Sequence, residues 1–197
     1  MNNEFSIQLT GSTDLNFLIY IQNDYLNQKQ KADLPKFPLL SDSVSYTETF
    51  EADFKETWEQ LTNREHNLAQ KEDITAEDLP LTELELRWFY DRLIDSSVPY
   101  EEFQFFYRAF SAWWDCLAGR FSIERGLGEE LHTIYGQLTD LLKERNLTPS
   151  KDLQLRFVYD DMLLAKNKTT DYFAVLSIEE FFIEREKLLA RLLEAMK

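Results

Sequence analysis

The sequence predicts an all-α fold, a single domain over residues 1–197 in which six to seven helices surround one aromatic-rich helix. Three observations predict it. Apolar residues recur at helical spacing over most of the chain. Only five glycines and five prolines interrupt the 197 residues, which favours long elements and few turns. The composition, 44% hydrophobic and 29% charged, is typical of a globular domain. The pattern also allows a short β pair near the N-terminus.

The segment 98–121 is expected to form the central helix. Pro99 suits its start, because the fixed φ of proline is already helical and its missing N–H needs no partner there. Gly119 and Gly126 predict its end. A buried aromatic side chain removes about 150–250 Å² from water, so the apolar face of this helix predicts the centre of the core. That face comprises Phe103, Phe106, Tyr107, Phe110, Trp113, Trp114, Leu117 and Phe121.

The N-terminal quarter is expected to contain one strand and one helix. Residues 3–10 alternate between apolar and polar, which predicts a half-buried strand, and its partner is expected around Val44 and Tyr46. A helix is expected to begin near Asp14. Residues 29–45 show no sustained period and are predicted to form an irregular connecting loop.

Three capping boxes, each a Ser or Thr followed three residues later by Glu, predict further helix starts. They are Ser45 with Glu48, Thr82 with Glu85, and Ser177 with Glu180. The expected helices cover residues 45–70, 82–94, 128–145, 148–166 and 177–196.

The net charge of −15 is concentrated in one part of the chain. Residues 48–102 hold sixteen acidic and five basic side chains, a net charge of −11. Such a field repels nucleic-acid phosphate and anionic lipid, and it attracts a basic protein. The sequence therefore predicts a basic protein partner and no direct binding to nucleic acid or membrane. The alternative is that the acidity only keeps the surface solvated.

The helix predicted over residues 82–94 carries the expected anchor of this interaction. Leu84 and Trp88 lie opposite its main apolar stripe, beside Asp91 and Asp95. Two interpretations are open: the helix is buried on two sides, or Trp88 is exposed inside an acidic rim, a composition typical of interface anchors. The predicted partner-binding residues are Glu56, Glu59, Glu72, Asp73, Glu77, Asp78, Glu85, Trp88, Asp91 and Asp95.

Two charged residues fall where apolar residues are expected. Arg185 lies in the middle of the apolar stripe of the C-terminal helix, and Asp161 lies between Phe157 and Val158 on the wheel of its own predicted helix. Because an unpaired buried charge costs several kcal/mol, a buried ion pair between Asp161 and Arg185 is predicted. The alternative is that Arg185 extends to solvent.

The sequence offers little catalytic chemistry. It has no glycine-rich phosphate loop and no Gly-x-Ser-x-Gly nucleophile motif. Its one cysteine, Cys116, excludes an internal disulfide and is expected to be buried on the aromatic helix. Glu129 and His132 have the spacing of carboxylate-bridged di-iron bundles, but both lie off the apolar stripe of their helix. No metal and no cofactor are therefore predicted.

These observations favour a non-catalytic interaction module, an acidic helical protein of the inhibitor, immunity or antitoxin, chaperone or adaptor type that binds a basic partner. The pattern predicts neither a signal peptide nor a membrane span, and the expected location is the cytoplasm. Two alternatives stay open. One is an enzyme or small-ligand receptor with an aromatic-lined pocket in the bundle, near Asp161 and Arg185. The other is a mimic of nucleic acid whose carboxylates are spaced like phosphates.

Overall fold

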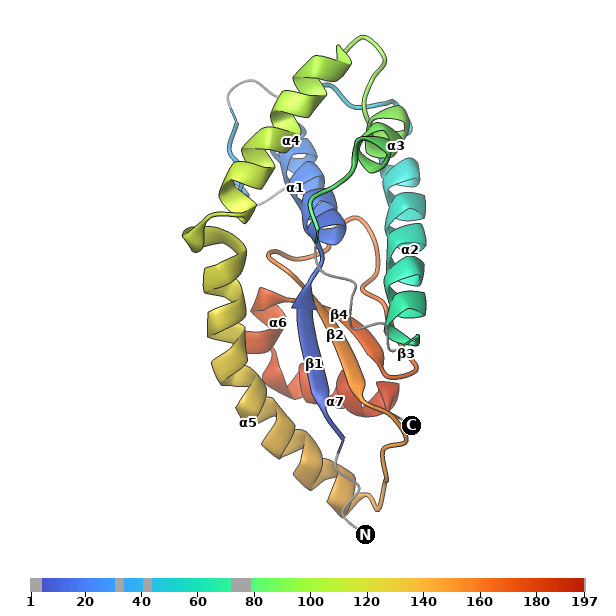
Figure 1. The fold of residues 1–197 in the computed structure, drawn as a ribbon, viewed down its shortest axis with the longest axis vertical. Helices are drawn as coiled ribbons and strands as arrows, with labels where there is room; N and C mark the ends of the chain where they lie inside the picture. The colour runs from blue at the N-terminus through green and yellow to red at the C-terminus, as the bar shows by residue number, and fades with distance from the viewer. Residues whose placement is uncertain (1–4, 31–33, 41–43, 72–78, 197) are drawn as a thin grey trace.

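The fold is mixed α/β rather than all-α. The structure, a computed structural model, describes residues 5–30, 34–40, 44–71 and 79–196. Within these ranges a four-stranded sheet lies beneath a group of helices (Figure 1). The prediction of an all-α bundle is therefore wrong.

The sheet combines one strand from the N-terminal part of the chain with three strands from the C-terminal part. Its order is β1-β2-β4-β3, formed by β1 (Ile7–Gly11), β2 (Leu153–Val158), β4 (Phe173–Ser177) and β3 (Thr169–Thr170). The first three strands run parallel, with Leu9 opposite Leu155 and Leu155 opposite Ala174, whereas β3 is antiparallel to β4. A strand near the N-terminus is thus confirmed. Its predicted pairing is wrong, because Tyr46 makes only an isolated bridge to Ile94.

The helix predicted over residues 148–166 is replaced by β2 and an irregular loop. Three fully buried residues of this segment are spaced two apart: Leu153, Leu155 and Phe157. A spacing of two is the period of a strand. Asp161 consequently lies in the loop after β2 and not on a helix.

Seven α-helices are present in the described residues. They are α1 (Thr13–Gln28), α2 (Phe50–Ala69), α3 (Glu83–Leu93), α4 (Tyr100–Trp114), α5 (Ser122–Glu144), α6 (Ile178–Phe182) and α7 (Arg185–Ala195), with a π-helical turn η1 (Leu117–Phe121) between α4 and α5. The capping boxes at Thr82 and Ser177 are confirmed. The box predicted at Ser45 is wrong, because α2 begins at Phe50 after Thr49, whose side chain makes no cap hydrogen bond.

The most buried helix in the described residues is α1 and not the aromatic helix α4. Every residue from 13 to 26 is buried, on all sides of α1. It contacts α2, α4 and β2 and runs through the centre of the upper half of the molecule (Figure 1). Because its polar residues are buried as well, they must find hydrogen-bond partners inside the protein.

Helix α4 packs its aromatic face against α1. The rings of Phe103, Phe106 and Phe110 lie around Phe17 of α1, with ring centroids 5.1–6.1 Å apart. The helix ends at Trp114, earlier than predicted, and the chain turns sharply at Gly119 before α5 begins. Leu117 and Phe121, predicted on the same buried face, are therefore exposed.

Four other helices, α2, α5, α6 and α7, contact the sheet. The long helix α5 runs beside β1 and contacts α6 and α7, while α2 contacts β4 (Figure 1). The predicted C-terminal helix is interrupted around Ile183, so that α6 and α7 are separate. In the part of the chain that the structure describes, no helix combines the length and the apolar character needed to cross a bilayer.

Candidate functional site

A cleft of about 420 Å³ opens between α2 and α3. The side of α3 that carries Leu86, Phe89 and Leu93 is buried in the core. Leu84 and Trp88 lie away from that side, Leu84 being 83% exposed and Trp88 half-buried. The helix is therefore not buried on two sides, and its second apolar stripe forms one wall of the cleft. The lining residues are Asp14, Gln60, Leu61, Arg64, Leu81, Leu84, Glu85, Trp88 and Phe89.

Three residues of the cleft lining form an ion network. Asp14 lies in the first turn of α1, where its buried carboxylate accepts hydrogen bonds from the Ser12 hydroxyl and from the backbone N–H of Leu15 (2.7 Å). Arg64 of α2 pairs with Asp14, and its second terminal nitrogen is 3.5 Å from Oε1 of Glu85 on α3. Two carboxylates thus share one guanidinium, which leaves the network with a net charge of −1.

The structure places part of the predicted partner-binding set around this cleft. Glu85 and Trp88 line it. Glu56 and Glu59 are exposed on α2, and Asp91 is exposed on α3. Asp95 lies just beyond α3, where hydrogen bonds from Ser97 lower the pKa of its carboxyl. Four members of the set, Glu72, Asp73, Glu77 and Asp78, lie outside the described residues.

Some of the acidic charge at this surface is neutralised within the chain. Glu56 is 3.5 Å from a guanidinium nitrogen of Arg92, and the same guanidinium lies over the ring of Trp88, 4.9 Å from its centroid. Glu85 is partly balanced by Arg64. By contrast, Glu59 and Asp91 form no ion pair with any described residue. Their charge is available to a partner.

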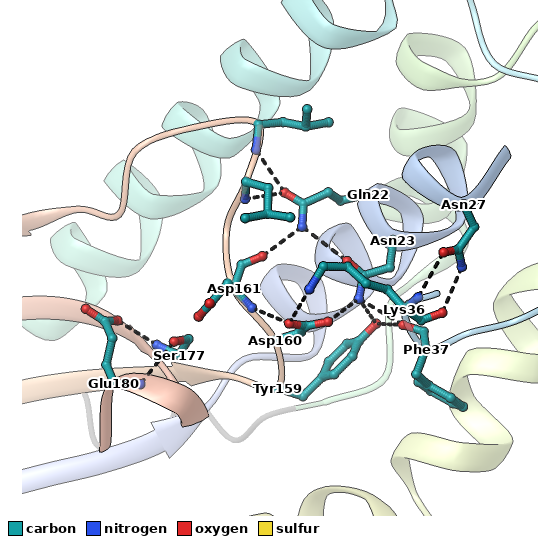
Figure 2. Close-up of polar contacts among 12 residues, drawn as sticks. Gln22, Asn23, Asn27, Lys36, Phe37, Tyr159, Asp160, Asp161, Ser177 and Glu180 are labelled. Atoms are coloured by element: carbon teal, nitrogen blue, oxygen red, sulfur yellow. Dashed lines mark hydrogen bonds and ion pairs between the residues drawn. The ribbon is translucent and has the colours of Figure 1, made fainter. Parts of the chain in front are cut away.

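A second group of polar residues gathers where β2 and β4 end, beside α1 (Figure 2). Asn23 of α1 donates to a carboxylate oxygen of Asp160 and to the backbone oxygen of Phe37, both at 2.9 Å. Lys36 forms an ion pair with Asp160 at 2.8 Å. The Tyr159 hydroxyl donates to the same Phe37 oxygen at 2.9 Å. These contacts hold the loop after α1 against the loop after β2.

The same helix fixes both loops through two more amides. Gln22 accepts hydrogen bonds from the backbone N–H groups of Leu163 and Leu164 and donates to the backbone oxygen of Asp161. Asn27 donates to the backbone oxygens of Lys36 and Pro38 and accepts from the Lys36 N–H, at 2.7–2.9 Å. The hydrogen-bonding capacity of these amides is used inside the protein, so this group is a structural clamp.

Tyr159 is not suited to act as a general base. Burial and the nearby Asp160 carboxylate raise the pKa of its hydroxyl well above the ordinary value for tyrosine. The neighbouring Tyr20 behaves in the same way, with burial raising its pKa to about 12. Both hydroxyls stay protonated at neutral pH and act as hydrogen-bond donors or acceptors.

The predicted ion pair between Asp161 and Arg185 is replaced by other contacts. Arg185, at the start of α7, pairs with Glu130 of α5. Asp161 lies beside Glu179 instead, and the hydrogen bond between their carboxyl groups raises the pKa of Glu179. The helical-wheel argument fails here because Asp161 is on a loop, so its position on a wheel has no meaning.

The remaining candidates from the sequence are surface residues. Glu129 and His132 are both exposed on α5. Cys116 is exposed too, contrary to prediction, because it follows the end of α4. Among the residues that the structure describes, no group of three or more His, Cys, Asp and Glu side chains could hold a metal ion.

Comparison with known proteins adds no assignment. No known protein family, curated protein or solved structure matches this chain significantly. The argument for function therefore depends on the geometry of this chain alone.

Sequence reasoning missed the α1 and α2 side of the cleft. The sequence predicts Asp14 only as a helix start and assigns no role to Arg64, one of five basic residues in segment 48–102. The only signal available was this isolated positive charge. Asp14 and Arg64 are fifty residues apart and meet only because α2 packs on α1.

Proposed function

We propose that this chain is a non-catalytic protein-interaction module that binds a basic partner through the surface formed by α2 and α3. The observation that carries the proposal is the apolar wall of the cleft. Leu84 is 83% exposed next to the half-buried Trp88, and the space beside them is hollow. Exposed apolar surface at a cavity marks interaction sites, and a tryptophan such as Trp88 is a frequent anchor of protein interfaces.

The charge at this surface supports a basic partner. The ion network that lines the cleft has a net charge of −1, and Glu59 and Asp91 add carboxylates that no described basic side chain pairs with. Carboxylates around an apolar centre speed association with a positively charged surface and disfavour an acidic one.

A protein partner fits the cleft better than an enclosed small molecule does. Small-ligand sites bury most of their ligand's surface inside a cavity. This cleft instead has a highly exposed apolar residue, Leu84, in its lining. A side chain presented by another protein can cover Leu84 and enter the cleft at the same time.

The test is affinity capture from cells that produce this protein, with three immobilised forms compared side by side. Leu84→Ser removes the anchor, and Leu117→Ser is the matched control, because Leu117 is also exposed but lies on η1. A basic protein is expected on the wild type and on the control. Loss of an interface anchor costs about 2 kcal/mol or more, so the Leu84→Ser form should bind roughly thirty-fold more weakly.

Elution with salt completes the test. Ions at 0.1 M screen charges beyond about 10 Å, so raised salt should release a partner held by the carboxylates. A partner retained equally by the Leu84→Ser and Leu117→Ser forms would contradict the proposal, as would a partner that high salt does not release.

A further inference from the structure

The cleft between α2 and α3 combines an apolar wall with free hydrogen-bond acceptors. Leu61 and Phe89 form the buried part of its wall, and Leu84 and Trp88 form the exposed part. A ligand that enters must cover apolar surface along its length. The alkyl stem of a lysine or arginine side chain does so while its head keeps polar contacts.

Two oxygen atoms at the cleft have unused capacity. Oε2 of Glu85 accepts from the backbone N–H and the hydroxyl of Thr82, at 2.9 and 2.8 Å, whereas the nearest partner of Oε1 among the described residues is Arg64, in an ion pair at 3.5 Å. Gln60 donates its amide N–H to Glu56 at 2.8 Å, and its carbonyl oxygen has no partner among the described residues. The cleft therefore presents two acceptors to a ligand.

The charges select between a cationic and an anionic ligand. Arg64 has N–H groups that could bind an anion. Yet Asp14 and Glu85 flank its guanidinium, so an incoming carboxylate or phosphate would meet two negative charges for one positive charge. A cation meets a net charge of −1, the loosely paired Oε1 of Glu85 and the unpartnered carbonyl oxygen of Gln60.

From this arrangement we propose that the cleft receives a lysine or arginine side chain of the partner. Its stem lies on Leu61, Trp88 and Phe89, and its charged head binds Oε1 of Glu85 and the carbonyl oxygen of Gln60. The inference rests on the proposed function, since it names the group of the basic partner that this surface recognises.

Three small probes of equal shape and different charge test the inference without the partner. They are phenethylamine, phenethyl alcohol and phenylacetate, which are cationic, neutral and anionic at neutral pH. Each is titrated at millimolar concentration into the isotope-labelled full chain, and backbone amide shifts are followed by two-dimensional proton–nitrogen NMR. Phenethylamine is expected to shift amides of the lining residues and to bind about two- to five-fold more tightly than the alcohol at low salt. Phenylacetate should bind most weakly.

A pair of variants assigns the charge preference to one residue. Glu85→Gln keeps the acceptor that the capping box needs and removes the negative charge. It should make phenethylamine and phenethyl alcohol bind equally well. Glu83→Gln is the control, because Glu83 lies in the same first turn of α3 but does not line the cleft. This variant should retain the preference for the amine.

Each other outcome overturns the inference. Tightest binding of phenylacetate would make Arg64 the recognising group. Equal binding of the amine and the alcohol to the wild type would show that charge does not contribute to recognition. Chemical-shift changes at residues away from the cleft lining would show that the probes bind elsewhere. These failures are distinguishable from failure of the proposed function. If the inference alone is wrong, a basic partner is still lost on Leu84→Ser. If the proposed function alone is wrong, the amine binds and no such partner is captured.

Discussion

Replacing Gly119 with alanine should destabilise the protein, because Gly119 lies at the kink inside η1, where the backbone leaves no space for a side chain. A Cβ built at this position lies 2.1 Å from the backbone oxygen of Trp113 and 2.7 Å from that of Trp114. Both oxygens belong to the last turn of α4, so they cannot rotate away as a flexible side chain could. The turn itself has to open, and this would shift α4 on α1.

The expected loss lies at the upper end for overpacking, about 3 kcal/mol. For a domain of this size that loss lowers the melting temperature by roughly 6–12 °C. The assay is urea unfolding followed by circular dichroism, with a thermal melt beside it. The changes in both midpoints give the free-energy difference independently.

Gly128→Ala is the matched control, since Gly128 lies inside α5 and has no heavy atom within 4 Å of the added Cβ. Alanine there should stabilise the protein by about 0.5–1 kcal/mol, because it limits the unfolded chain and suits a helix. The steric argument fails if Gly119→Ala unfolds at the wild-type midpoint while Gly128→Ala shows its expected gain.

Three further substitutions test the loop clamp at Asn27, the buried ion pair between Glu65 of α2 and Arg156 of β2, and the contact between the carboxyl groups of Asp161 and Glu179. Asn27→Ala removes three hydrogen bonds to the loop after α1; it should cost about 1–3 kcal/mol and increase amide hydrogen exchange in that loop, and unchanged exchange would contradict the clamp. Glu65→Gln leaves Arg156, whose side chain is 10% exposed, without its ionic partner, so denaturation should show a loss of about 3 kcal/mol. Asp161→Asn should return the raised pKa of Glu179 toward its ordinary value, measured by carboxyl NMR titration. A carboxyl group whose pKa is raised in the folded protein destabilises the folded state once the pH exceeds that raised pKa. The Asp161→Asn variant should therefore be more stable than wild type at a pH above the raised pKa of Glu179, and no more stable at a pH well below it.

The helices that local signals define were predictable from the sequence, and the sheet was not. The capping box at Thr82 sets the start of α3 through contacts within three residues, so a local pattern suffices. The pairing of β1 with β2 joins Leu9 to Leu155 across most of the chain. A parallel strand gives no local signal about its partner, and the short alternation in β2 was read as part of a helix.

Of the residues at the candidate site, too, only those defined by a local pattern could be predicted from the sequence. Glu85 and Trp88 were predicted because they lie on one helix whose second stripe is visible in the sequence. Asp14 and Arg64 enter the site only through the packing of α1 against α2. Their pairing also shows that counting charges along the chain overstates the free acidity of a surface, since Arg64 offsets part of it.

The two polar regions of this protein differ in how many of their polar groups already have hydrogen-bond partners within the chain. In α1 the amides of the buried Gln22 and the half-buried Asn27 make several hydrogen bonds each to loop backbone, so the group at the ends of β2 and β4 has little capacity for a ligand (Figure 2). At the cleft the balance is reversed. Oε1 of Glu85 and the Gln60 carbonyl lack a close partner among the described residues, and Leu84 is exposed beside them. Because recognition requires groups that folding has not already satisfied, the cleft between α2 and α3 is better suited to bind a ligand than the polar group at the ends of β2 and β4.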